Sequence, residues 1–186
     1  MFSYLWRKPV EPTFSFDDVT VSVAESVTAG AVANSICSEP GASTYFKGAI
    51  VPYTIASKKE LLNIDVQYAE LHNHANEFTT TEMAKAAVKM FKSRIGIATT
   101  GYSLPYKRDE NKELGQCELN ITTPYAYICL YDVLLDKSII LKKEYEYDPN
   151  QSDKLQRATL QAKVAIEATN LYKEYVKEIT TVKTMT

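Results

Sequence analysis

Residues 19–38 read VTVSVAESVTAGAVANSICS, and this stretch sets the order of the first elements. Apolar and small polar residues alternate over 19–24, which predicts a β-strand. Val32 and Ile36 stand one helical turn apart within 31–38, which predicts a helix there. Thr28 lies between the two segments and is a suitable helix N-cap. The stretch therefore predicts a strand, a tight turn and a helix.

Further strands are predicted from runs of β-forming residues. One such run is 46–53, where Pro52 indicates a sheet edge or a strand end. Another is 95–100. The last two, 125–131 and 138–147, are close enough in the chain to form a hairpin.

Helices are predicted between and after these strands. A short one is expected at 57–62, and a longer one follows a capping box at 79–82. A closing helix is expected over 151–179. The residues expected on its apolar side are Leu155, Ala158, Ala162, Ala165, Ile166, Ala168 and Leu171.

The order of these elements predicts an α/β (α+β) fold. We expect a single three-layer sandwich, with a central mixed β-sheet and helices on both faces. This domain would cover 17–180, between an extended aromatic and proline-containing arm at 1–16 and a tail at 181–186. The polar segment 101–123 is expected to be a long loop, and loops of this length are usually functional or mobile.

Composition excludes several classes of partner. The chain has 186 residues, and its 21 Lys and Arg nearly balance its 23 Asp and Glu, so there is no basic field to attract nucleic acid or an anionic membrane. No apolar run approaches the roughly 20 residues of a membrane-spanning helix. The three cysteines form no CxxC pair, which favours a reducing compartment. We expect a cytoplasmic protein without a nucleic-acid or membrane partner.

Ser26 lies at the predicted boundary between the first strand and the first helix. Small residues follow it, so a ligand can approach the backbone there. The first N–H groups of a helix are free donors, and the helix dipole places positive charge at this end. The position suits a nucleophile, an oxyanion or a phosphate, and a serine that only caps the turn is the alternative.

Tyr53 and Lys58 form the second candidate group. Tyr53 ends a predicted strand, and Lys58 lies near the start of the next helix. A serine hydroxyl is a weak nucleophile until a base takes its proton, and a lysine with a lowered pKa can be that base. A tyrosine can relay the proton or steady the leaving group. Lys59 competes for the role of base, while a solvated helix face and a packed aromatic are the alternatives.

The remaining chemistry-bearing residues predict no cofactor. His72 and His74 could supply two metal ligands, but no third ligand stands at a suitable spacing, so no metal is expected. Either histidine as a catalytic base is a minor alternative. The cysteines have no histidine partner at a recognisable spacing. The chain contains no GxGxxG, no phosphate-binding glycine–lysine loop and no G-x-S-x-G elbow.

Four sequence blocks occur in order up to Gly101. They are AESVTAG at 24–30, PGASTYFKG at 40–48, VPYTIASKKELL at 51–62 and ATTG at 98–101. The blocks resemble the C-terminal domain family of the competence/damage-inducible protein CinA. That family has A-E-S-x-T-G-G, P-G-(S/A)-S-x-x-F-x-G-G, V-x-Y-(S/T)-x-x-x-K-x-x-L-L and T-G-I-A-G-P. The resemblance covers about residues 19–175 and is most specific in its first half.

The resemblance implies an amidohydrolase that converts nicotinamide mononucleotide and water to nicotinate mononucleotide and ammonia, without a metal. By that analogy Ser26 is the nucleophile, and Tyr53 and Lys58 handle its proton. The residues that would contact this pyridine nucleotide are Glu25, Thr28, Ala29, Gly30, Thr100 and Gly101. The backbone at 28–30 would hold the oxyanion, and 99–101 would hold the phosphate. Lys58 must be uncharged to act as a base, so we expect it to be partly buried. The resemblance also suggests a homo-oligomer.

The chain departs from the family at the expected pocket. Ala29 replaces a glycine, and 101–105 read GYSLP in place of the smaller G-I-A-G-P. The alternative function is therefore a catalytically inactive relative that acts as an interaction or regulatory partner, with 1–16 as a possible binding arm. Its pocket would be closed by Tyr102 or Leu104. A third hypothesis is a hydrolase acting on an unrelated small amide or ester.

Overall fold

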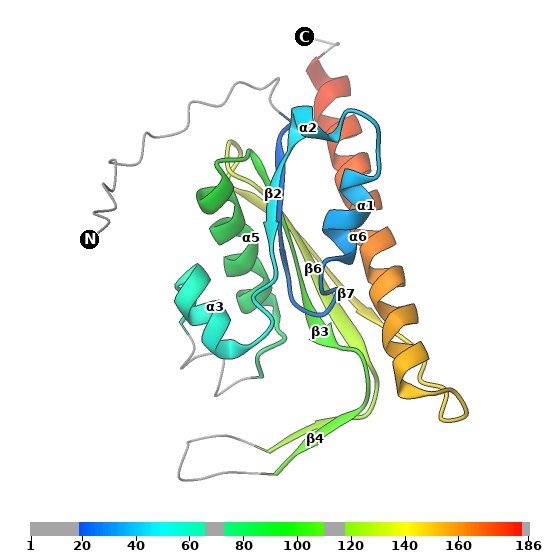
Figure 1. Cartoon of the computed structure of the whole chain (residues 1–186). Coiled ribbons are helices and arrows are strands. Elements are labelled where there is room, and N and C mark those ends of the chain that lie inside the picture. Colours follow the sequence, from blue (N-terminus) through cyan, green and yellow to red (C-terminus); the bar gives the residue numbers. More distant parts are fainter. Residues whose placement is uncertain (1–18, 66–72, 110–117, 184–186) are drawn as a thin grey trace, which may run out of the picture.

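A five-stranded sheet forms the middle layer of the computed structural model, which describes residues 19–65, 73–109 and 118–183 (Figure 1). The spatial order of the strands is β2-β1-β3-β6-β7. β1 pairs in parallel with β2 and β3, whereas the β3–β6 and β6–β7 pairs are antiparallel. The strands are β1 (Val21–Glu25), β2 (Phe46–Ile50), β3 (Ile95–Tyr102), β6 (Tyr125–Asp132) and β7 (Lys137–Glu144). The predicted mixed sheet is confirmed, including its closing hairpin.

Helices cover both faces of this sheet (Figure 1). α1 (Ala31–Cys37) and α6 (Asp153–Lys183) pack together on one face, and α5 (Glu77–Phe91) lies on the other with α3 (Ile55–Leu62) against it. A four-residue helix, α2 (Ala42–Tyr45), connects α1 to β2. The predicted three-layer α/β sandwich is confirmed.

Each face of the sheet has its own apolar core, because successive side chains of a strand point to opposite faces. Val21 and Val23 of β1 join the cluster beneath α1 and α6, and Ala24 joins the cluster beneath α5. β1 is buried along its whole length. The core therefore fixes the carboxyl end of β1, which is where the chain turns toward Ser26.

Two predicted helix starts are wrong. α1 has Gly30 as its N-cap, at φ 106° and without a side-chain cap bond, rather than Thr28. α5 begins after Asn76, whose side-chain oxygen accepts a hydrogen bond from the Thr79 N–H at 2.8 Å. The capping box expected at 79–82 therefore lies inside the helix. Asn76 thus satisfies a donor in the first turn of α5, whereas Gly30 supplies only the left-handed turn before α1.

The apolar side expected for α6 is only partly correct. Ala165 and Ala168 are buried as predicted, but Leu155 and Ile166 are 54% and 58% exposed. The helix instead buries a face whose larger members are Leu160, Val164, Tyr172 and Tyr175. Tyrosines supply much of the contact area there, and the predicted pattern did not count them as apolar.

The segment expected to be one long loop contains strands. β3 runs on to Tyr102, and β4 (Tyr106–Arg108) pairs antiparallel with β5 (Leu119–Ile121). This β4–β5 ribbon extends away from the end of the sheet (Figure 1). The predicted arm at 1–16 and the histidine at 72 lie outside the described residues. No helix in the described part of the chain has the length and apolar character needed to cross a membrane.

Candidate active site

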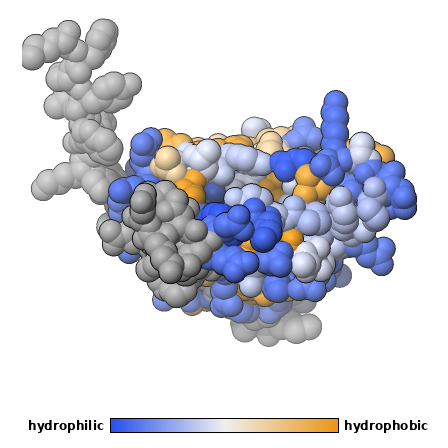
Figure 2. Space-filling view, turned by 90° about the horizontal axis from the view of Figure 1, so that it is seen from below, coloured by the Kyte–Doolittle hydropathy of each residue, from blue (hydrophilic) through white to orange (hydrophobic). Residues whose placement is uncertain are grey.

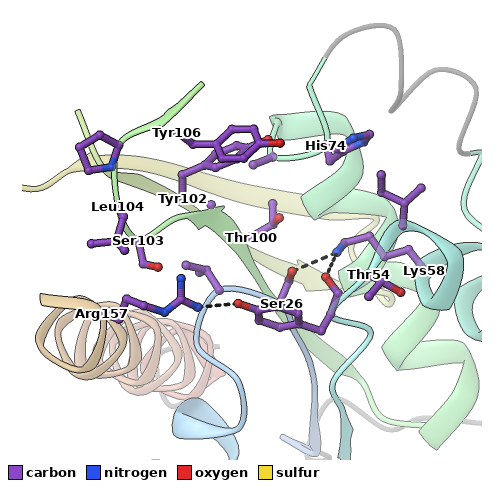
Figure 3. Close-up of a pocket in the computed structure, with 16 residues that line it drawn as sticks. Ser26, Thr54, Lys58, His74, Thr100, Tyr102, Ser103, Leu104, Tyr106 and Arg157 are labelled. Carbon is purple, nitrogen blue, oxygen red and sulfur yellow. Dashed lines mark hydrogen bonds between the residues drawn. The ribbon is translucent and has the colours of Figure 1, made fainter. Parts of the chain in front are cut away.

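A pocket of about 500 Å³ lies at the carboxyl ends of β1 and β3. Parallel strands commonly place ligands at this edge of a sheet. Figure 2 views the molecule from this end, and the described residues there show small hydrophobic groups among hydrophilic ones. The walls come from the turn after β1, the segment leading into α3, the end of β3 with β4, and one residue of α6, Arg157. Four of the predicted site residues on these walls are Ser26, Tyr53, Lys58 and Thr100 (Figure 3).

Ser26 and Lys58 are in direct contact in this pocket. The Nζ atom of Lys58 lies 3.0 Å from the Oγ atom of Ser26 (Figure 3). The Ser26 N–H donates to the Thr99 carbonyl at 2.9 Å, which fixes the turn after β1 against β3. Thr54 caps α3 through a reciprocal capping box with Ser57, which fixes the helix that carries Lys58. Both members of the pair are therefore held by well-defined local structure.

Lys58 is buried, with 4% of its surface exposed, whereas Lys59 is exposed. This burial lowers the pKa of Lys58 to about 8, because the charged ammonium is desolvated. The structure therefore places Lys58, and not Lys59, beside Ser26. With this pKa, about half of its side chains are uncharged near pH 8 and about a tenth at pH 7.

The Lys58 amine has three contacts, all of which its ammonium form can donate to, and two of them remain available to the neutral amine. Besides Ser26, Nζ lies 2.9 Å from the carbonyl oxygen of Pro52 and 3.3 Å from that of Tyr53. A carbonyl oxygen can only accept, so both N–H groups of a neutral amine are used on these two atoms. The remaining lone pair is then directed to the Ser26 hydroxyl, which can donate its proton to it.

Tyr53 contributes through both its backbone and its side chain. Its carbonyl holds Lys58, while its phenol oxygen accepts a 2.6 Å hydrogen bond from Nη2 of Arg157 on α6 (Figure 3). The Tyr53 side chain is 49% exposed and lines the pocket. Its hydroxyl therefore lies on the solvent-facing side of the site, with a cation beside it.

Glu25 does not line the pocket, and its carboxylate is used inside the fold. It accepts hydrogen bonds from the N–H groups of Gly30, Val32 and Ala33 at 2.8–3.1 Å and from the Thr28 hydroxyl at 2.6 Å. These are the first donors of α1, which would otherwise be unsatisfied. Glu25 therefore caps α1 from the end of β1. The predicted substrate contacts at Glu25, Thr28, Ala29 and Gly30 are not part of the pocket wall.

The turn after Ser26 leaves a different pair of donors. The N–H groups of Ala29 and Gly30 are taken by the Ser26 carbonyl and by Glu25. Among the described residues, no hydrogen bond uses the N–H of Val27 or Thr28. A backbone N–H just after a nucleophile is a common oxyanion donor. The candidate oxyanion donors are therefore the N–H groups of 27–28, directly after Ser26, rather than those of the predicted 28–30.

Thr100 and Gly101 do line the pocket, as the predicted phosphate site requires. A Cβ atom at Gly101 would lie 2.1 Å from the carbonyl oxygen of Tyr125, so only glycine allows β3 to approach β6 here. Gly101 is therefore also needed by the sheet. Both residues directly precede Tyr102, the last residue of β3.

The far wall of the pocket holds residues that the sequence patterns did not select as site residues, together with His74, which they left as a minor alternative base. His74 lines the pocket, and Nη1 of Arg108 lies 3.4 Å from its Nε2 atom. Tyr106 and Arg157 line it too. Among the described residues, no three His, Cys, Asp or Glu side chains gather in a way that could hold a metal. The run YSLPY directly after ATTG was the available signal for the aromatic wall. Arg157, on the last helix, was covered only by the weaker second half of the resemblance.

Comparison with known proteins shows the family of this chain. The model of the CinA C-terminal domain family matches residues 8–136. The chain belongs to this family. Among CinA-like proteins, that of Flavobacterium psychrophilum is 40% identical over 106 residues, or 57% of this chain and 25% of its own length. That of Fervidobacterium nodosum is 30% identical over 128 residues, covering 68% and 31% of the two chains. The match to these CinA-like proteins therefore spans a third of their length or less.

Solved CinA structures share the fold. The competence damage-inducible protein A of Klebsiella pneumoniae superposes with a TM-score of 0.64 at 18% identity, covering 84% of this chain and 86% of its own. A CinA superfamily protein of Escherichia coli gives a TM-score of 0.61 at 20% identity, covering 83% and 81%. At these identities the likeness concerns the fold alone. It does extend beyond residue 136, where the family match ends.

Proposed function

We propose that this CinA-family chain is a serine amidohydrolase that converts nicotinamide mononucleotide and water to nicotinate mononucleotide and ammonia. Ser26 is the nucleophile, Lys58 is the general base, and Tyr53 assists the leaving group. The observation that carries the proposal is the buried contact of 3.0 Å between the Lys58 amine and the Ser26 hydroxyl. A lysine beside a hydroxyl, with a lowered pKa and no carboxylate partner, is arranged as a base rather than as an ion pair.

The first step forms a bond between Oγ of Ser26 and the carboxamide carbon. The hydroxyl proton passes to the lone pair of Lys58, whose two N–H groups remain on the carbonyls of Pro52 and Tyr53. The amide oxygen becomes an oxyanion, for which Val27, which lines the pocket, and Thr28, next to it in the turn, have uncommitted N–H groups. Preorganised donors of this kind stabilise the tetrahedral intermediate more than the substrate.

The second step breaks the carbon–nitrogen bond. The Lys58 ammonium returns its proton to the departing amide nitrogen, so ammonia leaves and an ester on Ser26 remains. The Tyr53 hydroxyl, held by Arg157, is on the open side of the pocket and steadies the leaving nitrogen or the incoming water. Water activated by Lys58 then hydrolyses the ester and releases the carboxylate.

The electrostatics of the pocket favour an anionic substrate. Lys58 and Arg157 line it, and no Asp or Glu is present among its described lining residues. A mononucleotide phosphate would find favourable potential in such a site. The volume of about 500 Å³ lies within the usual range for small-molecule pockets.

The alternative function, a catalytically inactive relative, is less well supported. It requires that Tyr102 or Leu104 close the pocket, and both residues line it instead. Space beside Ser26 supports a site that admits a substrate.

The proposal is tested by incubating the protein with nicotinamide mononucleotide and measuring ammonia together with nicotinate mononucleotide. We expect equal amounts of both products, and a fall in rate on the order of 10³ or more in Ser26→Ala. Ser43→Ala, an exposed serine in α2 outside this pocket, is the matched control and should retain activity. No release by the wild type, or equal release by Ser26→Ala, would contradict the proposal.

A further inference from the structure

Three tyrosines pack ring against ring, with Tyr102 and Tyr106 stacked and Tyr125 tilted by 53° against Tyr102, and they are called here the tyrosine stack. The rings of Tyr102 and Tyr106 are stacked, with centroids 5.4 Å apart and planes inclined by 25°. Tyr125 packs against the other side of Tyr102 at 5.8 Å. Tyr125 is fixed in turn, because its hydroxyl donates to the Ala75 carbonyl at 3.0 Å and accepts from Asn73 at 2.6 Å. Tyr106, the outermost ring, is therefore held in place by the sheet.

This stack faces the reacting groups across the pocket. Figure 3 shows Tyr102 and Tyr106 on the side opposite Ser26 and Arg157, with Thr100 between them. Ser26 is hydrogen-bonded to β3 at Thr99, and Tyr102 follows Thr100 by two residues on the same face of that strand. Two residues of a strand span roughly 7 Å. Ser26, Tyr102 and Tyr106 line the same pocket, so a ring whose carboxamide lies at Ser26 occupies the space that the tyrosines border.

The tyrosines become more exposed from Tyr125 to Tyr106. Tyr125 is buried, whereas Tyr106 is 44% exposed and lines the pocket. Burial raises the pKa of the Tyr102 phenol to about 12, so the ring that backs Tyr106 stays neutral. An exposed aromatic face on a rigid, uncharged support stacks on planar rings and attracts cationic ones most strongly.

We propose that Tyr106, supported by Tyr102, determines specificity by stacking on a planar ring that carries the substrate's carboxamide, with preference for a cationic ring. The inference rests on the proposed function and adds to it a residue that determines specificity. The pocket then has two sides that favour different parts of the substrate. Arg157 and Lys58 favour an anionic group, and the tyrosine face takes a flat cation, which matches a pyridinium nucleotide.

The kinetic test compares Tyr106→Leu, Tyr106→Phe and wild type with nicotinamide mononucleotide as substrate. Tyr106→Leu keeps an apolar side chain but removes the ring, so KM should rise about tenfold, while kcat changes less than about twofold, because stacking is made equally with substrate and transition state. Tyr106→Phe should restore KM to within about twofold. Tyr147→Leu, which removes an exposed tyrosine outside this pocket, should leave KM unchanged. A wild-type KM in Tyr106→Leu would overturn the inference.

A binding test separates this inference from the amidase activity. Calorimetry with 1-methylnicotinamide, a planar cation without a phosphate, should give a Kd about tenfold weaker for Tyr106→Leu than for wild type or Tyr106→Phe. Piperidine-3-carboxamide has the same positive charge on a saturated ring and should bind all three proteins equally weakly. If no ammonia is released but this pattern holds, the amidase proposal fails and the stacking role stands. Equal binding of both probes to wild type, or no binding of the planar probe, overturns the stacking role.

Discussion

The amine of Lys58 lies 3.0 Å from the hydroxyl of Ser26, although 32 positions separate the two residues in the chain. The contact arises because β1 and β2 are parallel neighbours. The turn after β1 carries Ser26, and the helix after β2 carries Lys58. Two adjacent parallel strands deliver their carboxyl ends to the same edge of the sheet, so the fold itself creates the pair.

Activity should depend on the protonation of Lys58. Only the neutral amine can take the serine proton, and burial lowers its pKa to about 8. The rate of ammonia release under kcat/KM conditions should therefore rise with pH and level off above a midpoint near 8. Lys58→Arg should be inactive at every pH, because a guanidinium keeps its proton. A flat profile, or activity in Lys58→Arg, would exclude Lys58 as the base.

Lys58 should reduce the stability of the fold. Its pKa is lower in the folded state than the ordinary 10.5, so the cost of burying the amine is fully present below about pH 8 and disappears as the pH rises toward 10.5. Lys58→Met should raise the free energy of unfolding at pH 7 by roughly 1–2 kcal/mol, because the acceptors left without a donor offset part of the gain.

Urea denaturation at several pH values measures this effect. The gap between Lys58→Met and wild type should narrow between about pH 8 and pH 10, and the exposed Lys59→Met should show no gap. A Lys58→Met variant that is less stable than wild type at pH 7 would show that burying the Lys58 amine does not destabilise the fold.

Glu25 should matter to folding rather than to substrate binding. Its carboxylate accepts four hydrogen bonds at the start of α1, and an amide in Glu25→Gln offers a single acceptor oxygen and an NH₂ group facing N–H donors. We expect a loss of about 2–4 kcal/mol in unfolding free energy. Glu60→Gln, on the exposed side of α3, is the control and should change little. Wild-type stability in Glu25→Gln would argue against the capping role.

Ala29 is a residue at which this chain departs from the family pattern at a measurable cost. Its φ is 51°, in the left-handed region that favours glycine. Ala29→Gly should raise the unfolding free energy by about 0.5–1 kcal/mol, because relief of the left-handed strain exceeds the added chain entropy. Ala33→Gly, inside α1, should have the opposite sign and cost about 1 kcal/mol. Thermal or urea unfolding that gives both variants the same sign would refute this account of Ala29.

Local patterns were enough to predict much of the fold. The alternation in β1, the hairpin of β6 and β7, and the helix beginning before Lys58 each depend on residues close together in the chain. The pairing of Ser26 with Lys58 could also be predicted, because the sequence blocks around them resemble those of the CinA family.

Features that depend on long-range contacts could not be predicted. Glu25 was predicted to contact the substrate. Its carboxylate instead caps α1, and this role cannot be predicted from the sequence because it exists only once the turn is formed. Arg157 meets Tyr53 across 104 positions, and no local spacing reveals that contact. The aromatic wall depends on the extension of β3 to Tyr102 and on the pairing of β4 with β5. Both features lie in a segment that the sequence predicted to be a polar loop.

The central claim is that Lys58 activates Ser26, and covalent labelling tests it without requiring the natural substrate. The protein is treated with phenylmethanesulfonyl fluoride over a range of pH, and the labelled residue is identified by peptide mass spectrometry. We predict a label on Ser26 whose rate of formation rises with a midpoint near pH 8, following the pKa of Lys58, and which is lost in Lys58→Met but retained in Lys59→Met. Labelling of Ser26 at the same rate in wild type and Lys58→Met, or no labelling of Ser26 in the wild type, would contradict the claim.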